Sequence, residues 1–292
     1  MNLYFIGNMF NYASLLMIAS GANCISLKNG QMNLGGEGQV YFGGFITAIA
    51  LNFFYRSTAL PSGISFFLVF LICIFSGIII SFVSGILKLT KNANELLTTY
   101  LISSSMIPVI DSLIGGRFRL KTGNLIATEF IDESFRFKKY LPPSSLNFSL
   151  VFGIFVCLFF GFLLYKTRFG KRIEIFGKAR TFAIASGFSK FFYYCVPLCI
   201  SSVFHCLAGF FAITGTYYTC HQGFFSGLGW NALSVSLIAG SNPLKVIFVS
   251  VIYSFLYSLA TQVTLFGTTG FDISSIIQGL VLFVIAFFYK NK

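Results

Sequence analysis

The sequence predicts an all-α, polytopic membrane protein with about eight or nine spans. Of its 292 residues, 56% are hydrophobic and only 10% are charged, whereas soluble domains carry about 25% charged residues. No Asp, Glu, Lys or Arg occurs in residues 57–87, 140–165 or 191–244, and residues 246–289 contain only Asp272. Because a spanning helix needs about 20 mostly apolar residues, each tract can hold one or two spans. The runs lack the alternating polarity of barrel strands, which are about 10 residues long.

The apolar runs place the spans along the chain. The first run has no basic start and no small-residue cleavage site, so we interpret it as a retained span and not as a signal peptide. The whole chain, residues 1–292, is then a single transmembrane domain. The predicted spans are residues 2–20, 40–55, 64–87, 94–115, 146–165, 190–213, 223–239, 244–263 and 270–289.

Basic residues set the predicted orientation. If successive spans alternate in direction, the loop after residue 87, residues 166–190, the loop at Lys245 and the C-terminal tail lie on one side. Together they hold twelve of the twenty basic residues, so this side is predicted to be cytoplasmic. Residues 116–145 then form an external loop of mixed charge. These loops account for the net charge of +12 without any nucleic-acid partner.

Two glycine-rich segments, residues 21–44 and 223–239, predict broken or re-entrant helices. Irregular backbone is tolerated at membrane depth where it lines a cavity, so we expect a substrate path at these segments. The stretch "GQMNLGGEGQVYFGG" places Asn33, Glu37 and Gln39 among glycines. The two carboxamides offer donors and acceptors that suit hydroxyl groups or the edges of bases.

Glu37 has two interpretations. A carboxylate at the start of the helix expected near Val40 can cap its free amides and complement its dipole. An ionisable group in a span also usually marks function, so Glu37 can instead contact substrate. The two roles are compatible if the cap shapes the path.

Further polar candidates lie in the fourth span and in the second broken segment. Asn94, Thr98, Ser105 and Ser112 recur at helical spacing, so they share one face. This face is either interhelical glue or a cavity wall. Trp230, the single tryptophan, adjoins Asn231, and an aromatic face beside an amide suits a planar base or a sugar ring. The alternative for Trp230 is an interfacial anchor.

The stretch "FGKRIEIFGKARTFAIASGFSK", residues 169–190, is basic and carries small residues between apolar ones. A short cytoplasmic helix of this kind suits a groove on a partner protein. The alternative is a membrane-surface loop with snorkelling Lys and Arg side chains.

This stretch resembles the cytoplasmic coupling loop of the permease subunits of ABC importers, in which G-x-R-x-R-x-x-G-x-N-x-x-A-A-x-x-x-G is typical. The matching residues are Gly170, Arg172, Gly177, Ala183 and Gly187. Ala179, Arg180 and Thr181 replace the usual Asn-Pro-Glu. Other stretches resemble the ribose, branched-chain amino acid and nucleoside branch of these permeases, in register from about residue 30 to 289: "MNLGGEGQVYFGG", "NELLTTYLIS", "TEFIDESFRFKKYLPPSSLN", "GWNALSVSLIAGSNPLKVI" and "DISSIIQGLVLFVIAFF".

The resemblance implies a multi-pass permease of the cytoplasmic (inner) membrane, with an inverted-repeat-like fold, that carries a nucleoside (purine) or a related sugar. It implies a separate ATPase subunit, a second permease subunit (the same chain or another) and an extracytoplasmic substrate-binding protein. Residues 166–190 would be the coupling loop, with Arg172, Gly177, Ala183 and Gly187 in contact with the ATPase. The pathway candidates are Asn33, Glu37, Gln39, Asn94, Thr98, Trp230 and Asn231.

Missing motifs narrow the function further. The sequence has no G-x-x-x-x-G-K-[ST], so ATP must be bound by a partner subunit, and no H-E-x-x-H or G-x-S-x-G, so it predicts no enzyme, metal or cofactor site. The alternative is an ATP-independent secondary transporter or channel for a small polar solute. Such a protein needs acidic residues that face the pore, and only Glu37 and Asp272 are suitable.

Overall fold

The computed structural model describes residues 3–57, 60–121, 123–266 and the single positions 276, 279, 280 and 283. Over these residues it is built from helices, six of which are long and apolar enough to cross a membrane. This confirms the prediction of an all-α, polytopic membrane protein. The last predicted span, residues 270–289, and Asp272 lie outside the described residues apart from the single positions.

The helices follow the predicted spans closely and extend beyond most of them. A π-helical turn, η2 (Ile213–Tyr217), continues α8. A short 3-10 helix, η1 (Glu133–Phe135), lies in the loop of residues 116–145, which is called the external loop after its predicted side. The α-helices are α1 (Leu3–Lys28), α2 (Gly36–Ser57), α3 (Ser62–Lys91), α4 (Glu95–Gly115), α5 (Ser149–Lys166), α6 (Arg168–Lys178), α7 (Arg180–Ala185), α8 (Lys190–Ala212), α9 (Leu228–Ile238) and α10 (Pro243–Phe266).

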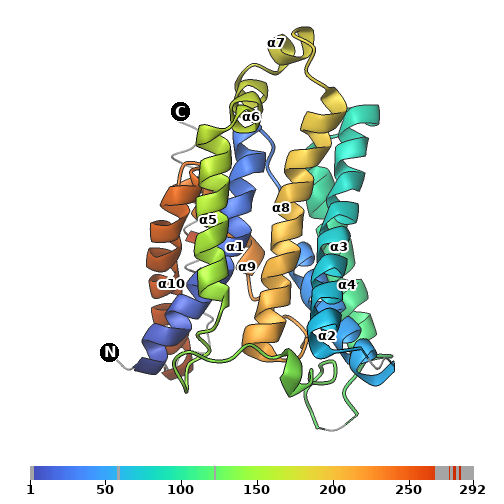
Figure 1. Cartoon of the computed structure of the whole chain (residues 1–292), viewed down its shortest axis with the longest axis vertical. Coiled ribbons are helices and arrows are strands. Elements are labelled where there is room, and N and C mark those ends of the chain that lie inside the picture. The colour runs from blue at the N-terminus through green and yellow to red at the C-terminus, as the bar shows by residue number, and fades with distance from the viewer. Residues whose placement is uncertain are drawn as a thin grey trace.

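Two helices form the centre of the bundle. In the most apolar stretches of α1 and α8, 83% of the residues are buried, against 22% in α3 and α4. Figure 1 shows α1 and α8 in the middle, with α5 and α10 on one flank and α2, α3 and α4 on the other. The peripheral helices leave large apolar side chains such as Phe75, Phe155 and Phe248 exposed, as lipid-facing helices do.

The first helix is longer than its apolar run predicts. The prediction ended this span at residue 20, but α1 continues to Lys28 because its polar residues find partners inside the bundle. Asn23 donates a hydrogen bond to the Ser236 hydroxyl of α9 (3.2 Å), and Ser26 donates to the carbonyl of Asn23 (2.9 Å). Buried polar groups that are paired cost little, so hydropathy alone places the helix end too early.

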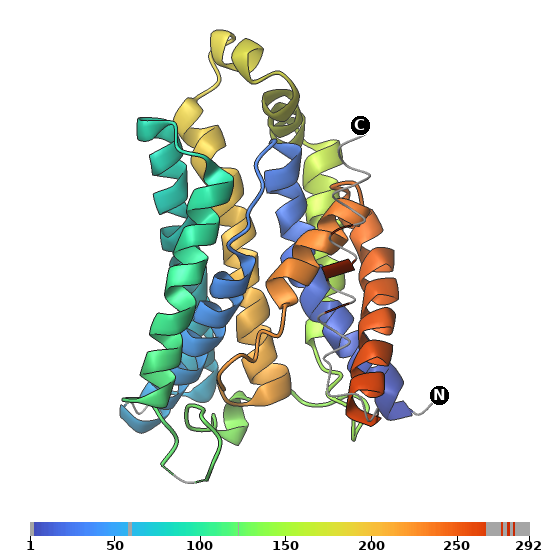
Figure 2. The ribbon, with the colours of Figure 1, turned by 180° about the vertical axis from the view of Figure 1, so that it is seen from behind.

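The break between α1 and α2 is correspondingly short. It comprises residues 29–35, not the whole of the predicted segment 21–44. Figure 2 shows this linker running from the end of α1 into the bundle, where α2 begins. The second predicted break is also present: α8 ends in η2, and α9 does not begin until Leu228. Both α2 and α9 therefore start inside the protein.

The two ends of the bundle differ. The helices α6 and α7 lie at one end, and the external loop and the start of α1 lie at the other (Figure 1). The external loop packs over the connection between η2 and α9, where Ala127 and His221 form an isolated antiparallel bridge. The amide of Thr128 donates to the Cys220 carbonyl over 2.9 Å, and that of Ile131 donates to the Tyr218 carbonyl over 2.8 Å.

Candidate functional site

The first turns of α2 and α9 meet in the middle of the protein. A Glu37 carboxylate oxygen accepts a hydrogen bond from the backbone amide of Trp230, 3.0 Å away. Trp230 lies in the first turn of α9, where backbone amides lack helical partners. A Cβ atom at Gly229 would lie 2.3 Å from the Glu37 nitrogen, so this approach requires glycine. Glu37 thus caps α9.

This geometry corrects the predicted capping role. The sequence suggested that Glu37 caps its own helix near Val40, but α2 already begins at Gly36, and the carboxylate reaches a different helix. Its second oxygen, Oε2, and Nε2 of His205 are buried without a partner among the described residues. His205 sits against Gly36, where a Cβ atom would be 2.9 Å from Nε2. The junction therefore retains unused hydrogen-bonding capacity deep in the bundle.

Asn33 and Gln39 belong to a buried polar network that joins four helices. The Asn33 carboxamide donates to Oε1 of Gln39 (2.9 Å) and to the Ser201 hydroxyl of α8 (3.0 Å). Gln39 donates in turn to Ser81 of α3 (3.3 Å), and Ser201 donates to Asn23 of α1 (2.9 Å). Asn33 and Gln39 are both 1% exposed, so they hold helices together in this conformation and line no open space.

The predicted polar face of α4 points away from the bundle. Asn94, Ser105 and Ser112 are exposed and Thr98 is half-buried. The face that packs on α2 instead carries Thr99 and Ser103, which accept hydrogen bonds from the amides of Leu34 (3.2 Å) and Gly38 (2.7 Å). Asn94 caps α4 by accepting from the Leu96 amide over 3.0 Å. The hydrogen bonds that hold α4 to the bundle are therefore made by the neighbouring face, with Thr99 and Ser103, and not by the predicted one.

Trp230 and Asn231 are neighbours in the sequence, but their side chains have different surroundings. The half-buried indole of Trp230 lies near the ring of Tyr100 on α4, with centroids 6.3 Å apart. Asn231 is fully buried; it donates to the Tyr12 hydroxyl over 2.7 Å and accepts from the Tyr253 hydroxyl over 2.6 Å. Asn231 thus fixes two tyrosines of α1 and α10.

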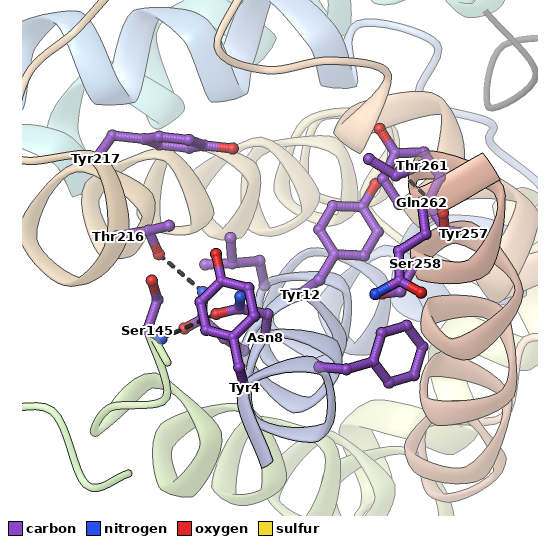
Figure 3. A pocket seen from close by; sticks show the side chains of 13 residues that line it. Tyr4, Asn8, Tyr12, Ser145, Thr216, Tyr217, Tyr257, Ser258, Thr261 and Gln262 are labelled. Atoms are coloured by element: carbon purple, nitrogen blue, oxygen red, sulfur yellow. Dashed lines mark hydrogen bonds between the residues drawn. The ribbon is translucent and has the colours of Figure 1, made fainter. Parts of the chain in front are cut away.

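One of these tyrosines lines a cavity of about 350 Å³ at the end of the bundle that carries the external loop. Figure 3 shows it between the start of α1, η2 and the last turns of α10. A second cavity of about 240 Å³ shares Tyr12, Tyr217 and Tyr257 with it and extends to Val40 and Leu228. The two cavities are therefore neighbours, and the second one reaches residues close to the junction of α2 and α9. None of the predicted pathway residues lines either cavity over the described part of the chain.

The loop 166–190 folds into α6 and α7 and divides the predicted coupling residues into two groups. Arg172 and Gly187 are exposed, and Gly187 adopts a φ of +86°. Ala183 is fully buried. Gly177 faces the protein, since a Cβ atom there would lie 2.1 Å from the Lys28 carbonyl. A hydrogen bond from Lys178 (2.8 Å) lowers the pKa of Glu174, so this acid stays charged on α6.

Arg180 ties this loop to the rest of the bundle. Its guanidinium donates to the Gly30 carbonyl over 3.4 Å and lies 4.0 Å from the Glu95 carboxylate at the start of α4. Glu95 also pairs with Lys88 of α3 at 3.1 Å. The guanidinium stacks over Tyr194 of α8, 5.4 Å from the ring centre. The α6–α7 loop is thus fixed to the linker that leads into α2.

Several of these residues gave no signal in the sequence. Tyr12 and Tyr257 lie in apolar runs at opposite ends of the chain, and only the fold stacks their rings, 4.5 Å apart. Arg180 stands where the coupling-loop pattern has a different residue. His205 lies in an uncharged span without any recognisable motif.

The buried network, the helices broken at mid-depth and the basic loop at one end define a helical membrane transport protein. The chain matches the family of permease components of the branched-chain amino acid transport system over residues 5–286, and it belongs to this family.

The curated relatives of this chain are named as permeases for several different solutes. The chain is 35% identical to a probable riboflavin import permease protein of Treponema pallidum over 240 residues, which cover 80% of this chain and 62% of the relative. It is 23% identical to a nucleoside ABC transporter permease protein of Lactococcus lactis, over 96% of this chain and 79% of the relative. It is also 23% identical to a glucose ABC transporter permease protein of Haloferax volcanii, over 91% and 72%. No solved structure matches the chain.

Proposed function

We propose that this chain is the membrane permease subunit of an ATP-binding-cassette importer in the cytoplasmic membrane. It forms the translocation pathway for a nucleoside or a related neutral solute and contains no catalytic centre of its own. A separate ATPase subunit binds and hydrolyses ATP, a second permease subunit completes the membrane unit, and an extracytoplasmic binding protein delivers the solute. The names of the relatives support this class of importer.

The observation that carries the proposal is the construction of the α6–α7 loop. Its outer surface presents Phe182, which is 64% exposed, and Ile175, which is 41% exposed, among basic residues. An apolar side chain this exposed at a polar end of the bundle suits a groove on a partner. Its inner surface is fixed to the α1–α2 linker by Gly177 and Arg180. When the ATPase displaces this loop, the α1–α2 linker moves with it, and so do the helices that meet at Glu37.

The predicted pathway residues divide accordingly. Trp230, which is half-buried at the junction of α2 and α9, remains a candidate for contact with the solute. Asn94 and Thr98 lie on the face of α4 that points away from the bundle, so they are candidates only for a path that runs between this chain and the second permease subunit. Asn33, Gln39 and Asn231 are buried and hydrogen-bonded, and in the proposed function they hold the wall of the path in place. ATP binding would favour one of two arrangements of these helices by stabilising it more than the other.

Replacing Phe182 tests docking to the ATPase. Phe182→Asp places a charge on the exposed surface without disturbing a buried contact, so the permease should still fold and reach the membrane. We expect the co-purified ATPase and the uptake of labelled inosine to fall by about tenfold or more, as loss of an anchor residue at an interface does. Co-purification in detergent and uptake into cells that express the neighbouring ATPase and binding protein measure both effects.

Phe130→Asp is the matched control, because Phe130 is 50% exposed on the external loop at the opposite end. It should leave the amount of co-purified ATPase unchanged. The importer proposal fails if the wild-type permease retains no ATPase, or if Phe182→Asp leaves ATPase binding and uptake intact.

A further inference from the structure

The outer cavity has the size and lining of a binding site for a small molecule. Its volume of about 350 Å³ is at the lower end of the range for ligand pockets, which is about 300–1,000 Å³. Its lining comes in part from the start of α1, which lies at the end of the bundle opposite α6 and α7 (Figure 1). A binding protein would release its solute at this end.

Aromatic rings dominate one part of the lining. Tyr12 and Tyr257 stack on each other with an interplanar angle of 11°. Tyr217 lies across from Tyr12 in Figure 3. Its ring is held by an edge contact with His221 (5.1 Å between ring centres) and a tilted contact with Phe224 (5.7 Å). Tyr12 is fixed by its hydrogen bond from Asn231. The rings are therefore pre-positioned to receive a flat molecule.

Amide and hydroxyl groups surround these rings. Asn8 accepts a hydrogen bond from the Ser145 amide over 2.9 Å, and Asn11 donates to the Thr216 hydroxyl over 2.9 Å. Ser258 and Gln262 of α10 add polar groups at the rim, where Figure 3 shows them beside Tyr257. Such groups supply both donors and acceptors to the edge of a heterocycle.

Charged side chains are missing from the lining over the part of the chain that the structure describes. A zwitterionic amino acid or a phosphate ester would have to leave water without any opposite charge to receive it, which is costly. A neutral ring with polar edges would lose little on transfer. The lining thus selects against the amino acids after which the family is described, and against nucleotides.

We propose that this cavity is a recognition subsite for an uncharged, flat heteroaromatic ring, such as a nucleobase or a flavin, stacked on Tyr217 and on the Tyr12–Tyr257 pair. The inference rests on the proposed transport function and specifies its substrate class. The neighbouring cavity shares three tyrosines with this subsite and reaches Val40 and Leu228, which lie close to the junction held by Glu37. The subsite is therefore the outer start of the path.

Binding to the full chain in lipid nanodiscs, without the ATPase, tests this subsite separately from the importer function. Riboflavin is the probe, because its fluorescence is quenched when it stacks on tyrosine. We expect saturable binding that inosine displaces and that leucine and AMP at the same concentration do not. Tyr217→Leu removes one stacking face and should weaken riboflavin binding by about tenfold or more, whereas Tyr217→Phe should stay within about threefold.

Tyr140→Leu is the matched control, since Tyr140 is 52% exposed and lies outside the cavity. It should bind riboflavin as the wild type does. The subsite is refuted if neither riboflavin nor inosine binds, if leucine or AMP competes as well as inosine, or if a folded Tyr217→Leu protein binds riboflavin unchanged. Loss of ATPase docking with riboflavin binding intact would instead refute the importer function alone.

Discussion

At the scale of single residues, Glu37 is the clearest structural test. Glu37→Ala removes the cap of α9, so the Trp230 amide is left unpaired inside the bundle. We expect a loss of about 1–2 kcal/mol in the free energy of unfolding, the usual cost of losing a capping side chain. Glu37→Gln keeps an acceptor oxygen at the same reach and should lose less. Thermal unfolding of the purified wild type, Glu37→Gln and Glu37→Ala proteins in detergent gives the order of their stabilities.

Glu133→Ala is the control for this series, because Glu133 pairs with Arg136 only at the surface, over 3.8 Å, and should cost close to nothing. A Glu37→Ala protein as stable as the wild type would contradict the capping role.

The carboxylate of Glu37 could be predicted as a cap from its place before an apolar run. The helix that it caps could not, because α9 lies far along the chain and only tertiary packing brings its first turn to Glu37.

At the scale of elements, the contact between α6 and the α1–α2 linker predicts that docking and coupling can be separated. Gly177→Ala adds a Cβ atom 2.1 Å from the Lys28 carbonyl, so α6 must move away from the linker. The exposed side chains of the docking surface, Phe182 and Ile175, are kept. We expect the ATPase to co-purify as before while inosine uptake per ATP hydrolysed falls by about tenfold, because the linker no longer follows the loop.

Gly63→Ala is the matched control, since nothing lies within 4 Å of the added Cβ atom at the start of α3. Normal coupling in Gly177→Ala, or loss of the ATPase from it, would show that Gly177 does not transmit the motion. Among the described residues, hydropathy was sufficient to predict that the lipid-facing helices exist, because each of them needs a long apolar run, but it did not predict where α1 ends. It could not show that Gly177 and Ala183 face inward while Arg172 and Gly187 face outward, because the spacing alone does not fix the rotation of α6 and α7 on the bundle.

At the scale of the whole molecule, the proposals share one orientation, with α6 and α7 in the cytoplasm and the tyrosine-lined cavity outside. The sequence supports this orientation through its basic loops, which hold twelve of the twenty Lys and Arg residues on one side. The cavity itself could not be predicted, because its rings come from α1, η2 and α10. What joins them is the packing of α1 at the centre, with α10 and α8 against it.

Single introduced cysteines test this orientation directly. All seven native cysteines are buried and unpaired, so a membrane-impermeant maleimide should label the wild-type protein only weakly in intact cells. Ser186→Cys, on the exposed part of the α6–α7 loop, should react only after the cells are opened, because the positive-inside rule places this loop in the cytoplasm. Ser134→Cys, exposed on the external loop, should react in intact cells. If Ser186→Cys reacts from outside, α6 and α7 cannot receive a cytoplasmic ATPase, and the tyrosine-lined cavity would open toward the cytoplasm and release the solute instead of receiving it.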